Sequence, residues 1–218
     1  MTAAPTLRGV VLDFDGVLVE SEGIKTTIFQ DLFSQFPDCA DEMMAYHLEH
    51  IAMPREAKFR RLAARCGGGE PLVRELLDAF SRHAVDRIAV CPEVPGADAF
   101  LKRFAPRLPL FLASVTPEAD LLEVLDRRDW RRHFERVFGD PPTAKTDAMR
   151  TVLEHLGAAP EEVLFIGDTV ADWRVSQETA VPFAARASRD WSGPADVRAV
   201  ADMNAVAAIV AERLHEGG

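Results

Sequence analysis

The chain has 218 residues, of which 48% are hydrophobic and 28% charged, and its formal net charge at pH 7 is -10. This composition is typical of an ordinary soluble protein, and no apolar run approaches the roughly 20 residues that a membrane-spanning helix needs. The negative charge argues against a nucleic-acid partner, because clustered Lys and Arg bind phosphate backbones, but it does not exclude a small phosphorylated substrate.

The N-terminal residues 1–5 lack the basic region and the apolar stretch of a signal peptide, which predicts a cytoplasmic location. Three cysteines, Cys39, Cys66 and Cys91, lie far apart and do not have the spacing of metal ligands. An odd number of cysteines cannot all pair within one chain. We therefore expect reduced structural thiols.

The first predicted element is a short apolar run at residues 7–12 that ends in the acidic sequence DFDG at residues 13–16. The run indicates a buried strand that carries acids at its end. An extended backbone places Asp13 and Asp15 on one side of the sheet, while a turn at Gly16 would orient them independently. Two such acids can form a metal site, an acid–base pair, a nucleophile with its proton donor, or a solvated turn, so the motif alone is ambiguous.

The following residues show only helix-like patterns, at 24–36, 41–51, 55–65 and 72–88. The sequence CGGG at residues 66–69 predicts a flexible break, and Pro92, Pro95 and Gly96 mark the return to the first domain. We therefore expect a helical domain at residues 17–91, inserted into a core domain formed by residues 1–16 and 92–218.

Strand-like apolar runs recur at residues 109–113, 136–138, 163–166 and 181–184, and helical patterns separate several of them. Alternating strands and helices predict an α/β fold with a doubly wound parallel sheet.

Three of these strands also end in chemically useful groups. Ser114 follows the second strand, Lys145 lies in a loop after the third, and Asp168 and Asp172 follow the fourth. In open α/β sheets, ligands bind in the crevice outside the carboxyl ends of the strands. The convergence of these groups with the two acids of the first strand predicts a functional site there.

The chain resembles phosphatases of the haloacid dehalogenase superfamily that carry a helical cap inserted after the first strand. Four motifs in the order and spacing of that family carry the resemblance: residues 13–21 (DFDGVLVES), Ser114 with Thr116, Lys145, and residues 167–172 (GDTVAD). They span nearly the whole chain. The resemblance implies a Rossmann-like core and an enzyme of the phosphoglycolate phosphatase or β-phosphoglucomutase type.

In such an enzyme Asp13 would attack phosphorus and become an aspartyl phosphate, which divides one difficult displacement into two easier steps. Asp15 would protonate the leaving oxygen and then accept a proton from the water that hydrolyses the intermediate. Dehalogenases of the superfamily lack this second acid. The presence of Asp15 therefore favours phosphoryl transfer.

The resemblance also implies Mg²⁺, held by Asp13, the backbone carbonyl of Asp15, and Asp168, since Mg²⁺ prefers hard oxygen ligands and keeps several waters. Asp172 lies one helical turn after Asp168 and is expected to contribute from the second coordination sphere or through a water. Without the resemblance, Asp168 is also typical of a helix N-cap.

Ser114 and Lys145 would bind the phosphoryl group. The Ser114 hydroxyl and the backbone N–H of Val115 would donate hydrogen bonds to its oxygens. Most relatives carry Asn or a similar polar residue where this chain has Val115, but the expected contact uses the amide. Lys145 would neutralise the charge shared with Asp13, although a lysine in this context alone more often marks a solvated helix start.

The inserted cap would close over the site and contact the leaving group. Candidate contacts are Lys25, early in the first helix, and Arg55 with Lys58, three residues apart on one face of a later helix. Their cations would suit an anionic leaving group, such as a carboxylate or a sugar acid. Each of them also fits a solvated helix face.

The leading hypothesis is hydrolysis of a small phosphate monoester, phosphoglycolate-like or sugar-derived. The alternatives are a phosphomutase, a phosphonatase in which Lys25 forms a Schiff base, and a catalytically idle binding protein. Lys25 replaces the His found near this position in sugar-phosphate mutases and many phosphatases, which weakens the first alternative. Phosphonatases lack the acid represented by Asp15, and an idle protein has no chemical need for the full set of polar groups. The sequence leaves the oligomeric state open.

Overall fold

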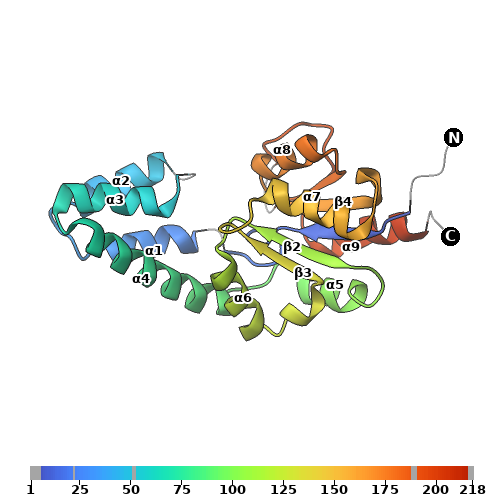
Figure 1. Cartoon of the computed structure of the whole chain (residues 1–218), viewed down its shortest axis with the longest axis horizontal. Helices are drawn as coiled ribbons and strands as arrows, with labels where there is room; N and C mark the ends of the chain where they lie inside the picture. The colour runs from blue at the N-terminus through green and yellow to red at the C-terminus, as the bar shows by residue number, and fades with distance from the viewer. Residues whose placement is uncertain (1–5, 22, 51–52, 188–190, 216–218) are drawn as a thin grey trace. The chain divides into compact units, whose positions relative to one another are not determined.

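The computed structural model describes residues 6–21, 23–50, 53–187 and 191–215. The chain divides into two compact units (Figure 1), which we call the sheet unit, Met1–Glu20 with Cys91–Gly218, and the helical unit, Ser21–Val90. Residues 17–20 and Cys91 thus lie in the sheet unit, although the sequence placed them in the helical domain. Each unit is described by itself below.

The sheet unit is built on a parallel sheet with the strand order β3-β2-β1-β4-β5-β6. Its strands are β1 (Gly9–Leu12), β2 (Leu110–Ser114), β3 (Arg136–Gly139), β4 (Val163–Gly167), β5 (Phe183–Arg186) and β6 (Ala199–Val200). The predicted α/β class with a doubly wound parallel sheet is confirmed. Sequence analysis missed β6, which is only two residues long.

The central strands are buried along their whole length, because helices cover both faces of the sheet. Figure 1 shows α7 (Lys145–Leu156) and α8 (Val170–Thr179) on one side of the sheet, and α5 (Ala97–Phe104) and α6 (Glu118–Arg127) on the other. The helix α9 (Met203–His215) completes the unit and contacts β5 and α5. This double cover explains why the strands are continuous apolar runs and not alternating ones.

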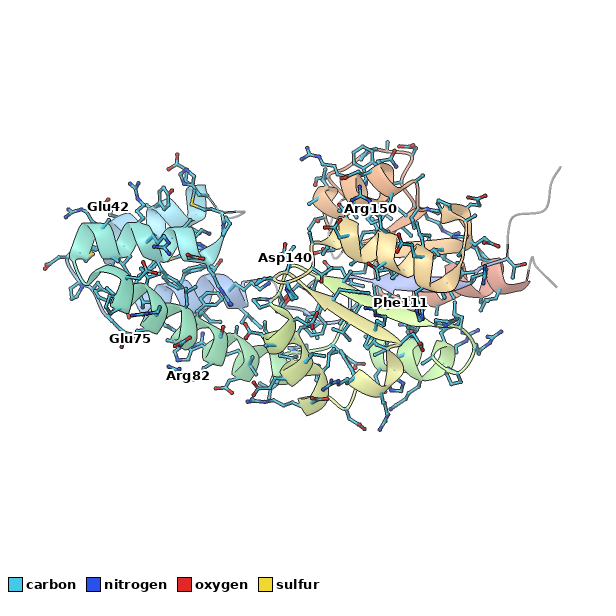
Figure 2. All side chains as sticks on the ribbon, in the orientation of Figure 1. Glu42, Glu75, Arg82, Phe111, Asp140 and Arg150 are labelled. Atoms are coloured by element: carbon cyan, nitrogen blue, oxygen red, sulfur yellow. A yellow bond between two sulfur atoms is a disulfide. The ribbon has the colours of Figure 1, made fainter. Side chains whose placement is uncertain are left out.

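The core beneath α7 combines alternate residues of neighbouring strands with the apolar side of the helix. Val11, Phe111 and Phe165 of the strands pack with Met149 and Val152 of α7; Phe111 is labelled in Figure 2. The strand register places Leu12 beside both Leu112 and Ile166. The residues that follow these strands therefore emerge at the same edge of the sheet.

The helical unit contains α1 (Ile24–Phe33), α2 (Ala40–Glu49), α3 (Arg55–Cys66) and α4 (Gly69–Val90). All four lie where the sequence predicts helices; the predicted end of the second helix, residue 51, falls outside the described residues. Phe29 lies at the centre of an aromatic cluster, with its ring centroid 4.8–5.5 Å from those of Phe33, Phe59 and Phe80. Charged residues such as Glu75 and Arg82 of α4 lie on the surface of the unit (Figure 2).

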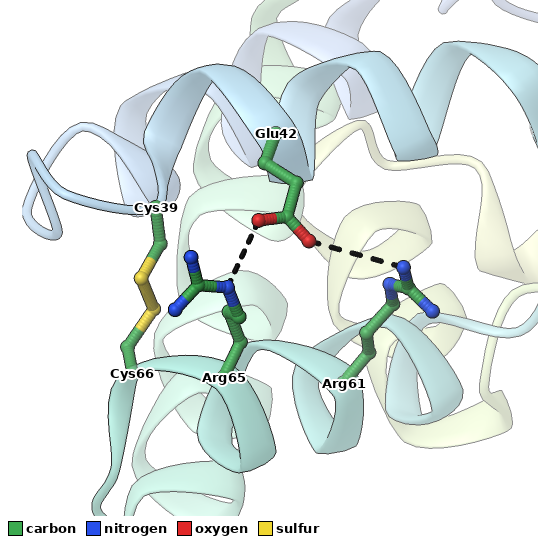
Figure 3. The surroundings of a disulfide bond; sticks show 5 residues. All are labelled: Cys39, Glu42, Arg61, Arg65 and Cys66. Carbon is green, nitrogen blue, oxygen red and sulfur yellow. Dashed lines mark hydrogen bonds and ion pairs between the residues drawn. A yellow bond between two sulfur atoms is a disulfide. The ribbon is translucent and has the colours of Figure 1, made fainter.

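A disulfide between Cys39 and Cys66 joins the N-terminus of α2 to the last residue of α3 (Figure 3). The expectation that all three cysteines are reduced thiols is wrong for these two, and only Cys91 is free. The reason is helix packing, which brings together two residues that are 27 apart in the sequence. Glu42 strengthens the same contact by pairing with Arg65 at 3.0 Å and with Arg61 at 3.9 Å.

Within the described ranges, none of the helices combines the length and the apolar character that crossing a bilayer requires.

Candidate active site

The polar residues predicted to form a site lie at the carboxyl edge of the sheet. Asp13 directly follows β1, Ser114 is the last residue of β2, and Asp168 directly follows β4. Lys145 begins α7, and Asp172 lies in the first turn of α8. The strand order reverses at β1, and this kind of switch point is where doubly wound sheets bind ligands.

Lys145 lies between two carboxylates. Its Nζ is 2.9 Å from Asp13 Oδ1 and 2.5 Å from Asp172 Oδ1. Asp13 is only 5% exposed, and its Oδ1 also accepts a hydrogen bond from the Phe14 amide at 2.7 Å. The ammonium group is therefore fixed beside the carboxylate that the sequence assigns as the nucleophile.

The electrostatics show an excess of buried negative charge. Burial raises the pKa of Asp13 to about 8; Lys145 opposes this, while the neighbouring aspartates add to it. Burial also raises the pKa of Asp168 to about 7, and Asp172 contributes in the same direction. Burial lowers the pKa of Lys145, but attraction and hydrogen bonding to Asp13 and Asp172 outweigh it, so the net pKa is raised. An added cation would relieve the repulsion between the acids.

Oxygen atoms of Asp13, Asp168 and Asp172 lie within 4.8 Å of one another, a grouping that can hold a metal ion. Carboxylate oxygens are the ligands that hard divalent cations prefer. Gly16 allows this close arrangement: it has a φ of 72°, and a Cβ there would lie 2.1 Å from Asp168 Oδ2. The donor set thus fits a divalent metal.

Both carboxylate oxygens of Asp172 already have hydrogen-bonding partners within the protein. Oδ1 contacts Lys145, and Oδ2 accepts hydrogen bonds from the Thr169 amide at 3.1 Å and the Thr169 hydroxyl at 2.6 Å. Thr169 in turn caps α8 by accepting from the Asp172 amide. The N-cap of this helix is therefore Thr169 and not Asp168. Asp172 supports Lys145 directly, which sequence spacing could not show.

Asp15 and Ser114 are connected through Thr116. The Thr116 hydroxyl donates to Asp15 Oδ2 at 2.9 Å, and the Thr116 amide donates to Ser114 Oγ at 3.0 Å. The Val115 side chain between them is 61% exposed. Thr116 entered the sequence analysis only as part of a motif, and its contact with the second acid was missed.

A family model described as haloacid dehalogenase-like hydrolase matches residues 10–186. The chain belongs to this family. Every motif that carried the sequence resemblance lies in the matched range, so the identification of a haloacid dehalogenase-like phosphatase, an enzyme, is confirmed.

Relatives of the haloacid dehalogenase-like chain include the phosphoglycolate phosphatase of Shigella boydii serotype 4 (strain Sb227), which is 27% identical over 202 residues. That match covers 81% of this chain and 79% of the relative. A proposed β-phosphoglucomutase from Thermotoga maritima has a TM-score of 0.73 at 18% identity, with 94% of this chain and 99% of the other covered. A proposed hydrolase of the same family from Bacillus subtilis, bound to magnesium, has a TM-score of 0.69 at 14% identity and the same coverage. These two structures show the shared fold.

The three residues predicted to contact the leaving group belong to the helical unit: Lys25, Arg55 and Lys58. Lys25 lies in the first turn of α1. Arg55 donates to Ser81 Oγ at 3.1 Å, and its guanidinium carbon lies 5.2 Å from the centroid of the Phe80 ring. It is therefore held against its own unit.

Lys58 does not lie on a solvated helix face, because its side chain is only 1% exposed. Its Nζ lies 2.9 Å from His47 Nδ1 and 4.9 Å from the centroid of the Phe29 ring. His47 Nε2 in turn lies 3.0 Å from Thr26 Oγ1. The aromatic cluster has thus enclosed a lysine that helical spacing alone placed beside Arg55 on an exposed face.

Proposed function

We propose that the protein is a Mg²⁺-dependent phosphatase that hydrolyses a small phosphate monoester through an aspartyl phosphate on Asp13. The observation that carries this proposal is the fixed contact of Lys145 with Asp13, at the carboxyl end of β1 and within the aspartate cluster. A buried carboxylate beside a cation and next to a metal-binding group is the arrangement that phosphoryl transfer needs.

In the first step, Asp13 attacks phosphorus. Its described contacts with Lys145 and the Phe14 amide both involve Oδ1, so Oδ2 is the oxygen that we assign to the attack. The bond from phosphorus to the leaving oxygen breaks as the new bond forms, and an aspartyl phosphate results. Lys145 neutralises charge that Asp13 shares with the phosphoryl group.

Asp15 acts as the general acid and then as the general base. The hydrogen bond from Thr116 orients its carboxylate. Asp15 donates its proton to the leaving oxygen and later accepts one from the water that attacks the aspartyl phosphate. That second step releases inorganic phosphate and restores Asp13.

The phosphoryl oxygens are bound by the Ser114 hydroxyl, the Val115 amide and the Lys145 ammonium. Ser114 is buried at the end of β2, which limits its motion. Asp13, the backbone carbonyl of Asp15, and Asp168 would hold Mg²⁺. Asp172 would hold the Lys145 ammonium in place. When bound, the metal supplies positive charge that offsets the repulsion between the nucleophile and the phosphoryl group.

We propose a phosphoglycolate-like or sugar-derived phosphate ester as the substrate. Phosphoglycolate phosphatases among the relatives support this class, and Lys25 of the helical unit is the cation that we assign to an anionic leaving group. We also propose a small-metabolite substrate, no nucleic-acid or membrane partner, and a cytoplasmic location.

The decisive experiment measures inorganic phosphate released from a panel of phosphate esters, with Mg²⁺ and with EDTA. We expect Mg²⁺-dependent release by the unchanged protein and a loss of at least about 1,000-fold for Asp13→Asn. Asp147→Asn is the matched control, because this exposed carboxylate of α7 pairs only with surface groups in the described structure. Turnover of no ester, or equal activity of Asp13→Asn, would show the proposal to be wrong; an isomerised ester in place of free phosphate would identify a phosphomutase.

A further inference from the structure

Arg186, the last residue of β5, is a buried cation that none of the site motifs includes. It is 3% exposed, and all three of its guanidinium nitrogens donate hydrogen bonds. Nη2 contacts Glu20 Oε1 at 2.5 Å, and Nη1 contacts Glu20 Oε2 at 3.2 Å. Nη1 also donates to the Gly16 carbonyl at 2.8 Å, and Nε donates to the Ala201 carbonyl at 3.2 Å.

The Gly16 carbonyl belongs to the loop that carries the two acids of β1. The Gly16 amide donates to the Val19 carbonyl at 2.9 Å, which closes this loop into a tight turn. One side of Gly16 faces the Asp168 carboxylate so closely that no Cβ fits. Gly16 therefore connects three groups: Asp15, which precedes it, Asp168, which it touches, and Arg186, which holds its carbonyl.

A buried ion pair of this kind is weak evidence for stability, because removing two charges from water offsets much of their attraction. The ion pair is better explained by the geometry that the guanidinium imposes on its acceptors than by a gain in stability. The planar guanidinium fork fixes a carboxylate and a carbonyl at the same time, which the single ammonium of a lysine does not reproduce. The pair between Arg186 and Glu20 thus fixes the loop at both ends, at Gly16 and at Glu20.

We propose that Arg186, paired with Glu20, is a positioning residue of the active site. It holds the Gly16 carbonyl and thereby sets where the carbonyl and carboxylate of Asp15 lie relative to Asp13 and Asp168. This inference rests on the proposed phosphatase function for its catalytic consequence. Its structural part, the fixing of the loop at residues 14–20, stands on the contacts of Arg186 alone.

The first test compares Arg186→Lys with Arg198→Lys, whose exposed pair with Glu212 at 3.0 Å is a matched control. With p-nitrophenyl phosphate we expect Arg186→Lys to lower kcat about 10- to 100-fold, because small displacements of catalytic groups have effects of this size. KM should stay within about 3-fold, and the Mg²⁺ concentration for half-maximal activity should rise. A role in folding alone predicts a loss of kcat that follows the fraction of unfolded protein, and that result would overturn the inference.

The second test needs no activity. Hydrogen exchange of the Gly16 and Leu18 amides is compared between the unchanged protein, Arg186→Lys and Arg198→Lys, and Glu20→Gln serves as a second variant that keeps the arginine. Faster exchange at these amides in the Arg186 and Glu20 variants supports the inference; unchanged exchange with unchanged kcat overturns it. If the unchanged protein hydrolyses no ester, the proposed function fails, and the exchange result alone then supports or overturns the positioning of the loop.

Discussion

Each unit of the molecule holds a lysine whose side chain is largely shielded from solvent, and the pKa values of the two lysines are shifted in opposite directions. Lys145 in the sheet unit contacts the carboxylates of Asp13 and Asp172, which raise its pKa. Lys58 in the helical unit contacts the imidazole of His47 and the ring of Phe29, and burial lowers its pKa. Burial disfavours the charged form of both lysines, so the partners decide the outcome.

The difference separates the cation that we assign to catalysis, Lys145, from one that is part of the interior of the helical unit, Lys58. In the sheet unit, charges converge on one edge of the sheet, and the mutual repulsion of the aspartates fits the binding of a metal ion. In the helical unit, aromatic packing and a disulfide hold the helices together, and the buried Lys58 contacts His47, which in turn contacts Thr26. Each of the following experiments tests this contrast.

The largest effect is expected for Lys145→Met. This variant removes the charge beside Asp13 but keeps the length of the side chain, so we expect kcat for a phosphate ester to fall about 1,000-fold. Lys102→Met is the control, because Lys102 pairs with Asp98 at the surface of the same unit. A loss of less than about 5-fold for Lys145→Met would contradict the assigned role of the lysine.

The next largest effect concerns the helical unit. Reducing the disulfide, or replacing both Cys39 and Cys66 by Ser, should lower the free energy of unfolding by about 3.5 kcal/mol, because a 27-residue loop is released in the unfolded chain. Urea unfolding with and without a reductant measures this change. Cys91→Ser is the control and should respond to the reductant like the unchanged protein. If the reductant does not change the stability of the unchanged protein, the disulfide does not contribute to it.

The pH dependence of stability should have opposite signs in the two units. The pKa of Asp13 is raised from 3.8 to about 8 on folding, so its stabilising contribution is present below pH 3.8 and lost as the pH rises through about 8. The pKa of His47 is lowered from 6.5 by burial and then by Lys58, so stability is instead lost as the pH falls below 6.5.

Urea unfolding of the metal-free protein in EDTA between pH 5 and 8 separates these contributions. Asp13→Asn should be more stable than the unchanged protein at pH 8, although we expect it to be inactive. His47→Gln should instead reduce the stability lost below pH 6.5. The prediction fails if Asp13→Asn is less stable than the unchanged protein at pH 8.

The smallest effect is expected from the buried polar pair of the helical unit. Lys58→Met alone leaves the His47 nitrogen without this partner and should lower the free energy of unfolding by about 1–2 kcal/mol. The double change Lys58→Met with His47→Leu removes both polar groups and should recover about 1 kcal/mol or more of that loss. Thermal and urea unfolding of the three proteins tests this, and equal stability of the single and double variants would contradict it.

Much of the sheet unit could be predicted from the sequence, because its information is local. The buried strands are continuous apolar runs, as in residues 7–12, and each functional group directly follows a strand or begins a helix. Since parallel strands end at one edge, Asp13, Ser114 and Asp168 had to emerge together once the fold class was known. The motif spacing then identified the family.

Contacts between residues that are distant in the sequence could not be predicted, because they depend on how the helices and strands pack. Cys39 reaches Cys66 because α2 packs against α3, and Lys58 is buried against Phe29 of α1 and His47 of α2. Arg186 meets Glu20 across 166 residues of sequence. The fold class, the family and the groups at the ends of the strands follow from the amino-acid sequence, because periodicity and motif spacing are local. The partner of each buried charge was decided by the packing of the helices and strands, which no local pattern encodes.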